Sequence, residues 1–286
     1  MGQRIFDSYM VVDWSANGSP KTGRDSLWIG HLRPGQAMAL DNPPTRAAAM
    51  AKIAAMLDEE VRADRPVLAG FDFAFGYPCG LARAISPRAD WRDIWAYLHD
   101  HLTDGPDNAN NRFDLAAQIN ALFPGDGPFW GNGLARDIPG LPRRKPVGWG
   151  DSLPDNRRLA DSLAKGAQEV WKLSGAGSVG GQSLTGIAAL EGLRRHMPVK
   201  IWPFDPISDE AAPAFAPVLA EVFPSLVPLD PAEHPVRDAA QVIGLAKTLA
   251  RWDASGRLSD MIHAAARLPD SVRRHEGMIL GVEHGL

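Results

Sequence analysis

Two short stretches, YMVVD at residues 9–13 and VLAGFD at residues 67–72, decide the fold of this chain. Each is an apolar run that ends directly on an aspartate, Asp13 in the first and Asp72 in the second. Such runs, bounded by turn residues, are typical of buried strands. A carboxylate there lies on the rim of the sheet, where open α/β sheets bind their ligands, and it is costly to bury unpaired. Both aspartates are therefore candidate site residues.

The segments around these two runs predict a mixed sheet with flanking helices. The first two predicted strands are joined by a loop with turn residues, which favours an antiparallel pair. Thr45 follows two prolines and is suited to cap the first helix. Strands are predicted at 8–13, 26–32, 36–40, 66–73, 199–202 and 220–223. Helices are predicted from Thr45 to Val61, at 234–252 and at 258–268.

Residues 79–198 differ in character, because they contain no strand pattern. Helices are predicted there at 90–102, 108–123, 156–173 and 182–196. A loop rich in Gly, Pro and Trp, with Phe129 and Trp130, lies between them, and its aromatic residues favour an ordered, packed loop. We therefore expect a core formed by residues 1–78 and 199–286, with residues 79–198 as a helical insertion that packs on it as a cap.

The composition fits an ordinary globular chain of 286 residues, with 45% hydrophobic and 22% charged residues. The formal net charge of −4 lacks the basic excess that is usual for a dedicated nucleic-acid binder. Cys79 is the only cysteine, so a disulfide within the chain and a multi-cysteine zinc site are excluded. Neither a secretory signal nor a membrane span is recognisable, so a cytoplasmic protein is expected, whereas its oligomeric state stays open.

Two further acids extend the pattern. Glu221 lies within the apolar segment 219–223, and Asp238 lies early in a helix beside two small residues, Ala239 and Ala240. Carboxylates that converge from two strands and a helix suit hard cations such as Mg²⁺ or Mn²⁺. The structural alternative is that Asp13 bonds loop amides and that Asp238 stabilises the first turn of its helix.

The order of these features resembles the ribonuclease-H-like superfamily, and within it a large bacterial and archaeal family described as a domain of unknown function. The matching segments lie at residues 11–15, 70–78, 220–226 and 237–240. The resemblance implies a ribonuclease-H-like mixed sheet with Asp13, Asp72 and Asp238 holding a metal ion and Glu221 as a fourth catalytic residue. It implies no reaction, because the superfamily includes nucleases, transposases, resolvases and kinases.

Several residues are candidate phosphate ligands. The string at 175–180 fits G-x-G-x-x-G, but a helix end is predicted before it instead of a strand, which argues against a dinucleotide site. Gly177 and Ser178 can still bind a phosphate before the next helix, or can simply connect two helices. Ser15 in the first hairpin loop is another candidate. The basic candidates are Arg143, Arg144, Arg157 and Arg158.

Three functions are consistent with these residues. The leading one is a Mg²⁺- or Mn²⁺-dependent hydrolase, a nuclease or phosphohydrolase, that acts on a phosphate-containing small molecule or a nucleic-acid end. The second is a nucleotide-dependent, kinase-like enzyme whose hairpin loop at 14–21 contacts a phosphate. The third is a non-catalytic scaffold that binds a ligand or a partner through the aromatic loop around Trp130.

Overall fold

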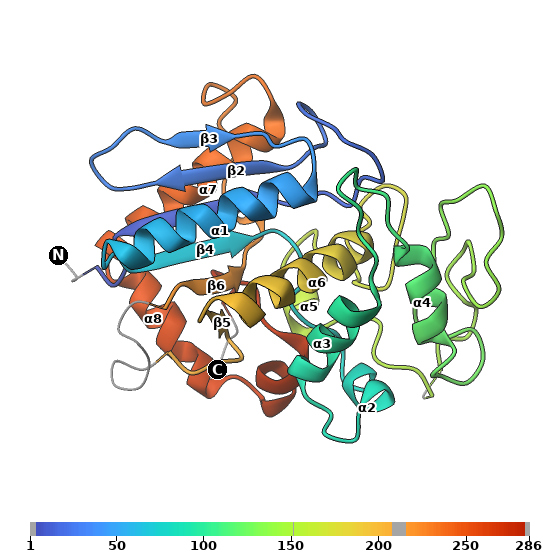
Figure 1. Ribbon diagram of the computed structural model, residues 1–286. Coiled ribbons are helices and arrows are strands. Elements are labelled where there is room, and N and C mark those ends of the chain that lie inside the picture. Colours follow the sequence, from blue (N-terminus) through green and yellow to red (C-terminus); the bar gives the residue numbers. More distant parts are fainter. Residues whose placement is uncertain (1–3, 151, 208–215, 284–286) are drawn as a thin grey trace.

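The computed structural model describes residues 4–150, 152–207 and 216–283, and its centre is a six-stranded mixed sheet (Figure 1). The strand order is β3-β2-β1-β4-β6-β5. Strands β1, β4, β6 and β5 run parallel, whereas β2 is antiparallel to both β1 and β3. The strands are β1 (Ser8–Asp13), β2 (Trp28–Leu32), β3 (Ala39–Asp41), β4 (Val67–Phe71), β5 (Lys200–Trp202) and β6 (Val218–Glu221). The predicted α/β fold with a mixed sheet flanked by helices is confirmed.

Helices cover both faces of this sheet. They are α1 (Arg46–Arg62), α2 (Leu81–Ile85), α3 (Trp91–His101), α4 (Arg112–Asn120), α5 (Leu159–Leu163), α6 (Gly180–His196), α7 (Arg237–Ala254) and α8 (Arg257–Ala264). Short 3₁₀ turns at Pro224–Leu226 and Ala265–Arg267 and a π turn at Val272–Glu276 complete the list. The predicted cap of α1 is confirmed, because Thr45 Oγ1 accepts a hydrogen bond of 3.2 Å from the Ala48 amide. Across the described ranges, no helix is long and apolar enough to cross a membrane.

Alternation along β1 divides the core into two layers. Met10 and Val12 face the layer that contains Ile53 of α1, and Val11 faces the layer that contains Val242 of α7. In Figure 1, α1 and α6 lie in front of the sheet and α7 lies behind it. A side chain at Gly30 of β2 would come within 2.5 Å of Val242 Cγ1, so this glycine lets α7 lie close to the sheet.

The structure corrects the helix that was predicted at 156–173. Only Leu159–Leu163 is helical, and Gly166 then adopts a left-handed φ of 91° that a continuing helix does not allow. Residues before the glycine-rich string are extended instead, because Leu173 donates its amide to the Trp130 carbonyl at 3.0 Å. The predicted helix end before Gly175 was therefore wrong, although this short pairing lies outside the six-stranded sheet.

The segment 79–198 contributes none of the six strands among the described residues. Its helices nevertheless share the core, since Leu98 of α3 and Leu190 of α6 belong to the same hydrophobic cluster as Val12 of β1. The aromatic loop is packed as expected, with Phe129 fully buried and its ring 5.0 Å from that of Trp171. The proposed division into core and insertion stays a prediction, because one continuous hydrophobic cluster joins the two parts.

Candidate functional site

Asp13 and Asp72 meet at the carboxyl edge of the sheet. Asp13 ends β1 and Asp72 follows β4, and these strands are parallel neighbours with Val12 opposite Phe71. The Trp14 amide donates to Asp72 Oδ1 at 2.6 Å. The Asp13 carboxyl group lies beside that of Asp72, close enough for each to perturb the pKa of the other. The adjacent strand ends thus bring together the two acids that the sequence singled out.

The protonation of this pair is strongly perturbed. Burial, followed by the charge of Asp72, raises the pKa of Asp13 well above its usual range. Burial likewise raises the pKa of Asp72 to about 6, and the hydrogen bonds from Asp13 and from the Trp14 amide oppose that rise. Each carboxyl group keeps some solvent contact but has protein atoms around most of it. Both carboxyl groups therefore hold a proton more readily than an exposed aspartate does, and they titrate as a pair.

Asp238 brings a third carboxylate to the pair. It lies in the first turn of α7, and its Oδ2 accepts a hydrogen bond of 2.6 Å from the Asp25 amide. Its charge raises the pKa of both Asp13 and Asp72. Among the residues that the structure describes, no lysine or arginine forms an ion pair with Asp13, Asp72 or Asp238. The three aspartates therefore form an uncompensated negative group, called here the aspartate cluster.

The aspartate cluster lies at the junction of two cavities. The larger, of about 540 Å³, is lined by Asp13 and Asp238 together with the loop after β1 and the loop before α6. The smaller, of about 200 Å³, is lined by Asp72. Gln182 of α6 lines both cavities, and its Nε2 donates to the Trp14 carbonyl at 2.8 Å. A molecule of the size usual for small-molecule sites can thus reach the acids.

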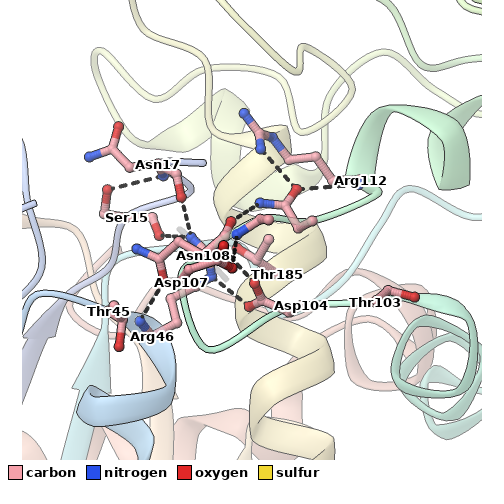
Figure 2. Close-up of polar contacts among 12 residues, drawn as sticks. Ser15, Asn17, Thr45, Arg46, Thr103, Asp104, Asp107, Asn108, Arg112 and Thr185 are labelled. Atoms are coloured by element: carbon pink, nitrogen blue, oxygen red, sulfur yellow. Dashed lines mark hydrogen bonds and ion pairs between the residues drawn. The ribbon is translucent and has the colours of Figure 1, made fainter. Parts of the chain in front are cut away.

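Arg46 holds the loop that forms one wall of the larger cavity (Figure 2). Its guanidinium donates to the carbonyls of Ser15 and Asn17 at 3.0 and 2.8 Å. It also makes two hydrogen bonds of 2.6 Å to Asp104. Arg46 itself is buried, and its bidentate pair with the more exposed Asp104 fixes the loop that follows Asp13. The sequence reveals Arg46 only as the residue after a helix cap, so its role was missed.

Glu221 has a different environment from the three aspartates. It lies at the end of β6, opposite Phe71, and lines the smaller cavity beside Asp72. Arg158 donates to both of its carboxylate oxygens, at 2.7 and 2.6 Å, and the Phe75 amide donates at 3.1 Å. Arg158 also pairs with Asp161 at 2.7 Å. Glu221 therefore lies in a buried ion-pair network in which two carboxylates share one guanidinium, and not in the aspartate cluster.

Only some of the predicted phosphate ligands lie together at the larger cavity. Ser15, Gly177 and Ser178 line the larger cavity. The four candidate arginines do not: Arg158 is 1% exposed, is paired with carboxylates and lines the smaller cavity, so its phosphate role stays a prediction. Arg143 bonds Asp137, and Arg157 bonds the Asp161 carbonyl. Arg144 is exposed and lines neither cavity. The arginine that does line the larger cavity is Arg112, which the sequence analysis missed.

The aspartate cluster is suited to a hard cation, although it is not closed. Over the described residues, no group of three or more His, Cys, Asp or Glu side chains is arranged to hold a metal ion as it stands. Mg²⁺ is commonly held by only one or two carboxylates, with waters and substrate phosphates completing the octahedron. Asp13 and Asp72 supply two such ligands, and Asp238 Oδ2 is occupied by a loop amide.

Comparison with known proteins adds no assignment. No family model matches the chain, and no curated protein or solved structure shows significant similarity to it.

Proposed function

We propose that this protein is a divalent-metal-dependent hydrolase that cleaves a phosphodiester or phosphate ester. One observation carries the proposal: the neighbouring carboxyl groups of Asp13 and Asp72, largely enclosed and with no basic partner among the described residues, have raised pKa values and line adjoining cavities, the larger of about 540 Å³. Proteins seldom keep such unfavourable pairs for structure alone, and strongly perturbed acids in a cleft are typical of functional sites.

In this proposal, the three aspartates hold the cation. Mg²⁺ or Mn²⁺, when bound, would activate a water and neutralise charge on the phosphoryl group. Asp13 and Asp72 would be its ligands once both are ionised, and Asp238 would join them directly or through a water. The Trp14 amide keeps Asp72 oriented, and the Asp25 amide keeps Asp238 oriented. Rigid strand ends thus preposition the ligands before any substrate arrives.

The strand arrangement supports the resemblance to the ribonuclease-H-like superfamily. An antiparallel β1–β2–β3 ribbon is followed by parallel β4 beside β1, and the acids lie at the ends of β1 and β4 and on α7. This is the order on which the sequence resemblance was based. The resemblance stays a proposal, and it leaves the reaction to be decided by the site.

The test is a calorimetric Mn²⁺ titration beside hydrolysis of a chromogenic phosphodiester and a chromogenic phosphomonoester. The wild type should bind Mn²⁺ stoichiometrically and hydrolyse one substrate only with metal. Asp13→Asn, which keeps the shape and can donate to Asp72, should weaken Mn²⁺ binding by on the order of 100-fold and abolish turnover. Glu233→Gln, at an exposed ion pair with Lys247, is the matched control. A folded Asp13→Asn protein with wild-type Mn²⁺ affinity and turnover would contradict the proposal.

A kinase-like enzyme is the second candidate, because the loop after β1 contributes Ser15, Ala16 and Asn17 to the same cavity. In that case ATP should bind with Mg²⁺, and replacing residues 17–21 with a shorter turn should abolish the binding. Mn²⁺-dependent hydrolysis without ATP binding would exclude this candidate.

A further inference from the structure

Arg112 is a half-buried cation without a carboxylate partner among the described residues. It begins α4 and lines the larger cavity together with Asp13 and Asp238. Its Nη1 donates to Asn110 Oδ1 at 2.9 Å, whereas its Nε is buried and has no hydrogen-bond partner. In the part of the chain that the structure describes, no carboxylate forms an ion pair with it. A guanidinium with an unpaired buried Nε and no ion-pair partner favours binding of an anion from outside the chain.

The nearest candidate partner is already used. Asp104 contributes to the electrostatics of Arg112, but both of its oxygens accept hydrogen bonds from Arg46. Figure 2 shows the Arg112 guanidinium pointing away from Asp104. Burial, and then the charge of Arg46, lower the pKa of Arg112 to about 10, so it is still a cation at neutral pH. The two arginines that are buried among the described residues, Arg46 and Arg158, both have carboxylate partners.

The start of α6 forms the wall against which Arg112 lies. A Cβ atom at Gly181 would be 3.2 Å from Arg112 Nε and 3.3 Å from the Leu173 carbonyl oxygen. Glycine at this position therefore lets the guanidinium lie against the start of α6 without a tight contact. The helix start has no side-chain cap, and among the described residues no acceptor bonds the amides of Gly181 and Gln182. Gly177 and Ser178 of the preceding loop line the same cavity. Free amides at a helix start and a guanidinium together favour a tetrahedral oxyanion.

We propose that Arg112, the first turn of α6 and the loop at 175–178 form a phosphate subsite for a terminal phosphomonoester of the substrate. The anion binding stands by itself, whereas its part in substrate choice rests on the hydrolase proposed above. The substrate would then carry one phosphate on Arg112 and its scissile ester at the aspartate cluster. Such a molecule is a small phosphorylated compound of nucleotide size or the phosphorylated end of a strand, and a cavity of about 540 Å³ accommodates either end group.

The test measures phosphate binding without metal. Inorganic phosphate is titrated by calorimetry in the presence of EDTA, and the thermal midpoint is followed in parallel. The wild type should bind one phosphate and gain stability, and Arg112→Gln should weaken binding by at least about tenfold. Gly181→Ala, which places a methyl group against the guanidinium, should weaken binding as well. Arg143→Gln, at an exposed arginine bonded to Asp137, is the control and should bind as the wild type does.

Two further comparisons separate this subsite from the hydrolase and identify its source of phosphate. Arg112→Gln should bind Mn²⁺ as the wild type does, because Arg112 is not a proposed metal ligand. A wild-type protein that binds phosphate but no Mn²⁺ would contradict the proposed hydrolase and support the phosphate subsite. Thymidine 5′-monophosphate is compared with thymidine, and a 5′-phosphorylated oligothymidine with its unphosphorylated form. Tighter binding of thymidine 5′-monophosphate than of thymidine indicates a small-molecule substrate. A preference for the phosphate that is seen only with the oligothymidines indicates a strand end. A folded Arg112→Gln protein that binds phosphate as tightly as the wild type overturns the proposal.

Discussion

Two groups of acids lie at the same edge of the sheet, at the ends of the neighbouring strands β4 and β6, and they are treated in opposite ways. Glu221 and Asp161 surround Arg158, and every charge in that network has a partner. Asp13, Asp72 and Asp238 have no cation partner among the described residues, and the pKa values of Asp13 and Asp72 are raised. The difference teaches that a carboxylate at a strand end is not by itself a site. The missing counter-ion distinguishes the site from the structural network.

The contrast extends to the arginines. Arg158, which is buried, and Arg112, which is half-buried, both lie in the helical segment between β4 and β5, and the sequence gives no reason to separate them. Arg158 is saturated by carboxylates, and Arg112 is left with a single amide oxygen as its acceptor. The larger cavity thus has unbalanced charge of both signs in its lining. A metal ion at the acids and an anion at Arg112 would neutralise both.

The largest expected effect breaks the compensated network. Arg158→Met leaves Glu221 and Asp161 buried without a cation, so the free energy of unfolding should fall by about 3–5 kcal/mol. Urea denaturation measures it, with Arg257→Met at an exposed pair with Glu283 as the control. Wild-type stability together with lost phosphate binding would show that Arg158 belongs to the site instead.

A smaller effect is expected from Glu221→Gln, which tests the residue that the sequence assigned to the site. The amide keeps the shape but loses the charge that binds Arg158, so stability should fall by about 2 kcal/mol. Mn²⁺ affinity, measured by calorimetry on the folded variant, should stay within about twofold of the wild type. A loss of Mn²⁺ binding as large as that of Asp13→Asn would place Glu221 among the metal ligands.

The smallest expected effect is a gain in stability instead of a loss. Because the pKa of Asp72 is raised to about 6, the folded protein binds more protons than the unfolded chain, and metal-free stability falls as pH rises through this range. Asp13→Asn removes a carboxyl group whose pKa is raised in the folded protein, so in EDTA it should be more stable than the wild type at neutral pH by on the order of 1 kcal/mol.

The pH dependence of this difference is the diagnostic part. The gain in thermal midpoint of Asp13→Asn over the wild type should shrink from about pH 7 to about pH 5. At the lower pH the unfolded wild-type chain comes closer to binding the same number of protons as the folded pair. Mn²⁺ should stabilise the wild type and leave the variant unchanged. Equal midpoints at both pH values would mean that the two carboxyl groups do not interact.

Local patterns carried most of the fold. The strand at Ser8–Asp13 was predicted with its observed bounds, and the helix after Thr45 began at its predicted cap, because apolar runs and caps act over a few residues. The helix predicted at 156–173 failed because Gly166 and the pairing of Trp130 with the chain before Gly175 override propensity. Tertiary pairing of this kind leaves no periodic signal in either segment.

The sequence by itself determined that Asp13 and Asp72 share one edge, since each ends a buried apolar run and parallel neighbours end on the same side. Only the tertiary structure decided which charges are balanced. Arg158 meets Glu221 across 63 positions, and Arg46 takes Asp104 away from Arg112 across 58. Strand ends are set by local hydrophobic pattern, whereas the pairing of charges depends on how distant segments pack. That packing, and not the count of acids and bases, leaves four charged residues around the cavities without a counter-ion among the described residues: Asp13, Asp72, Asp238 and Arg112.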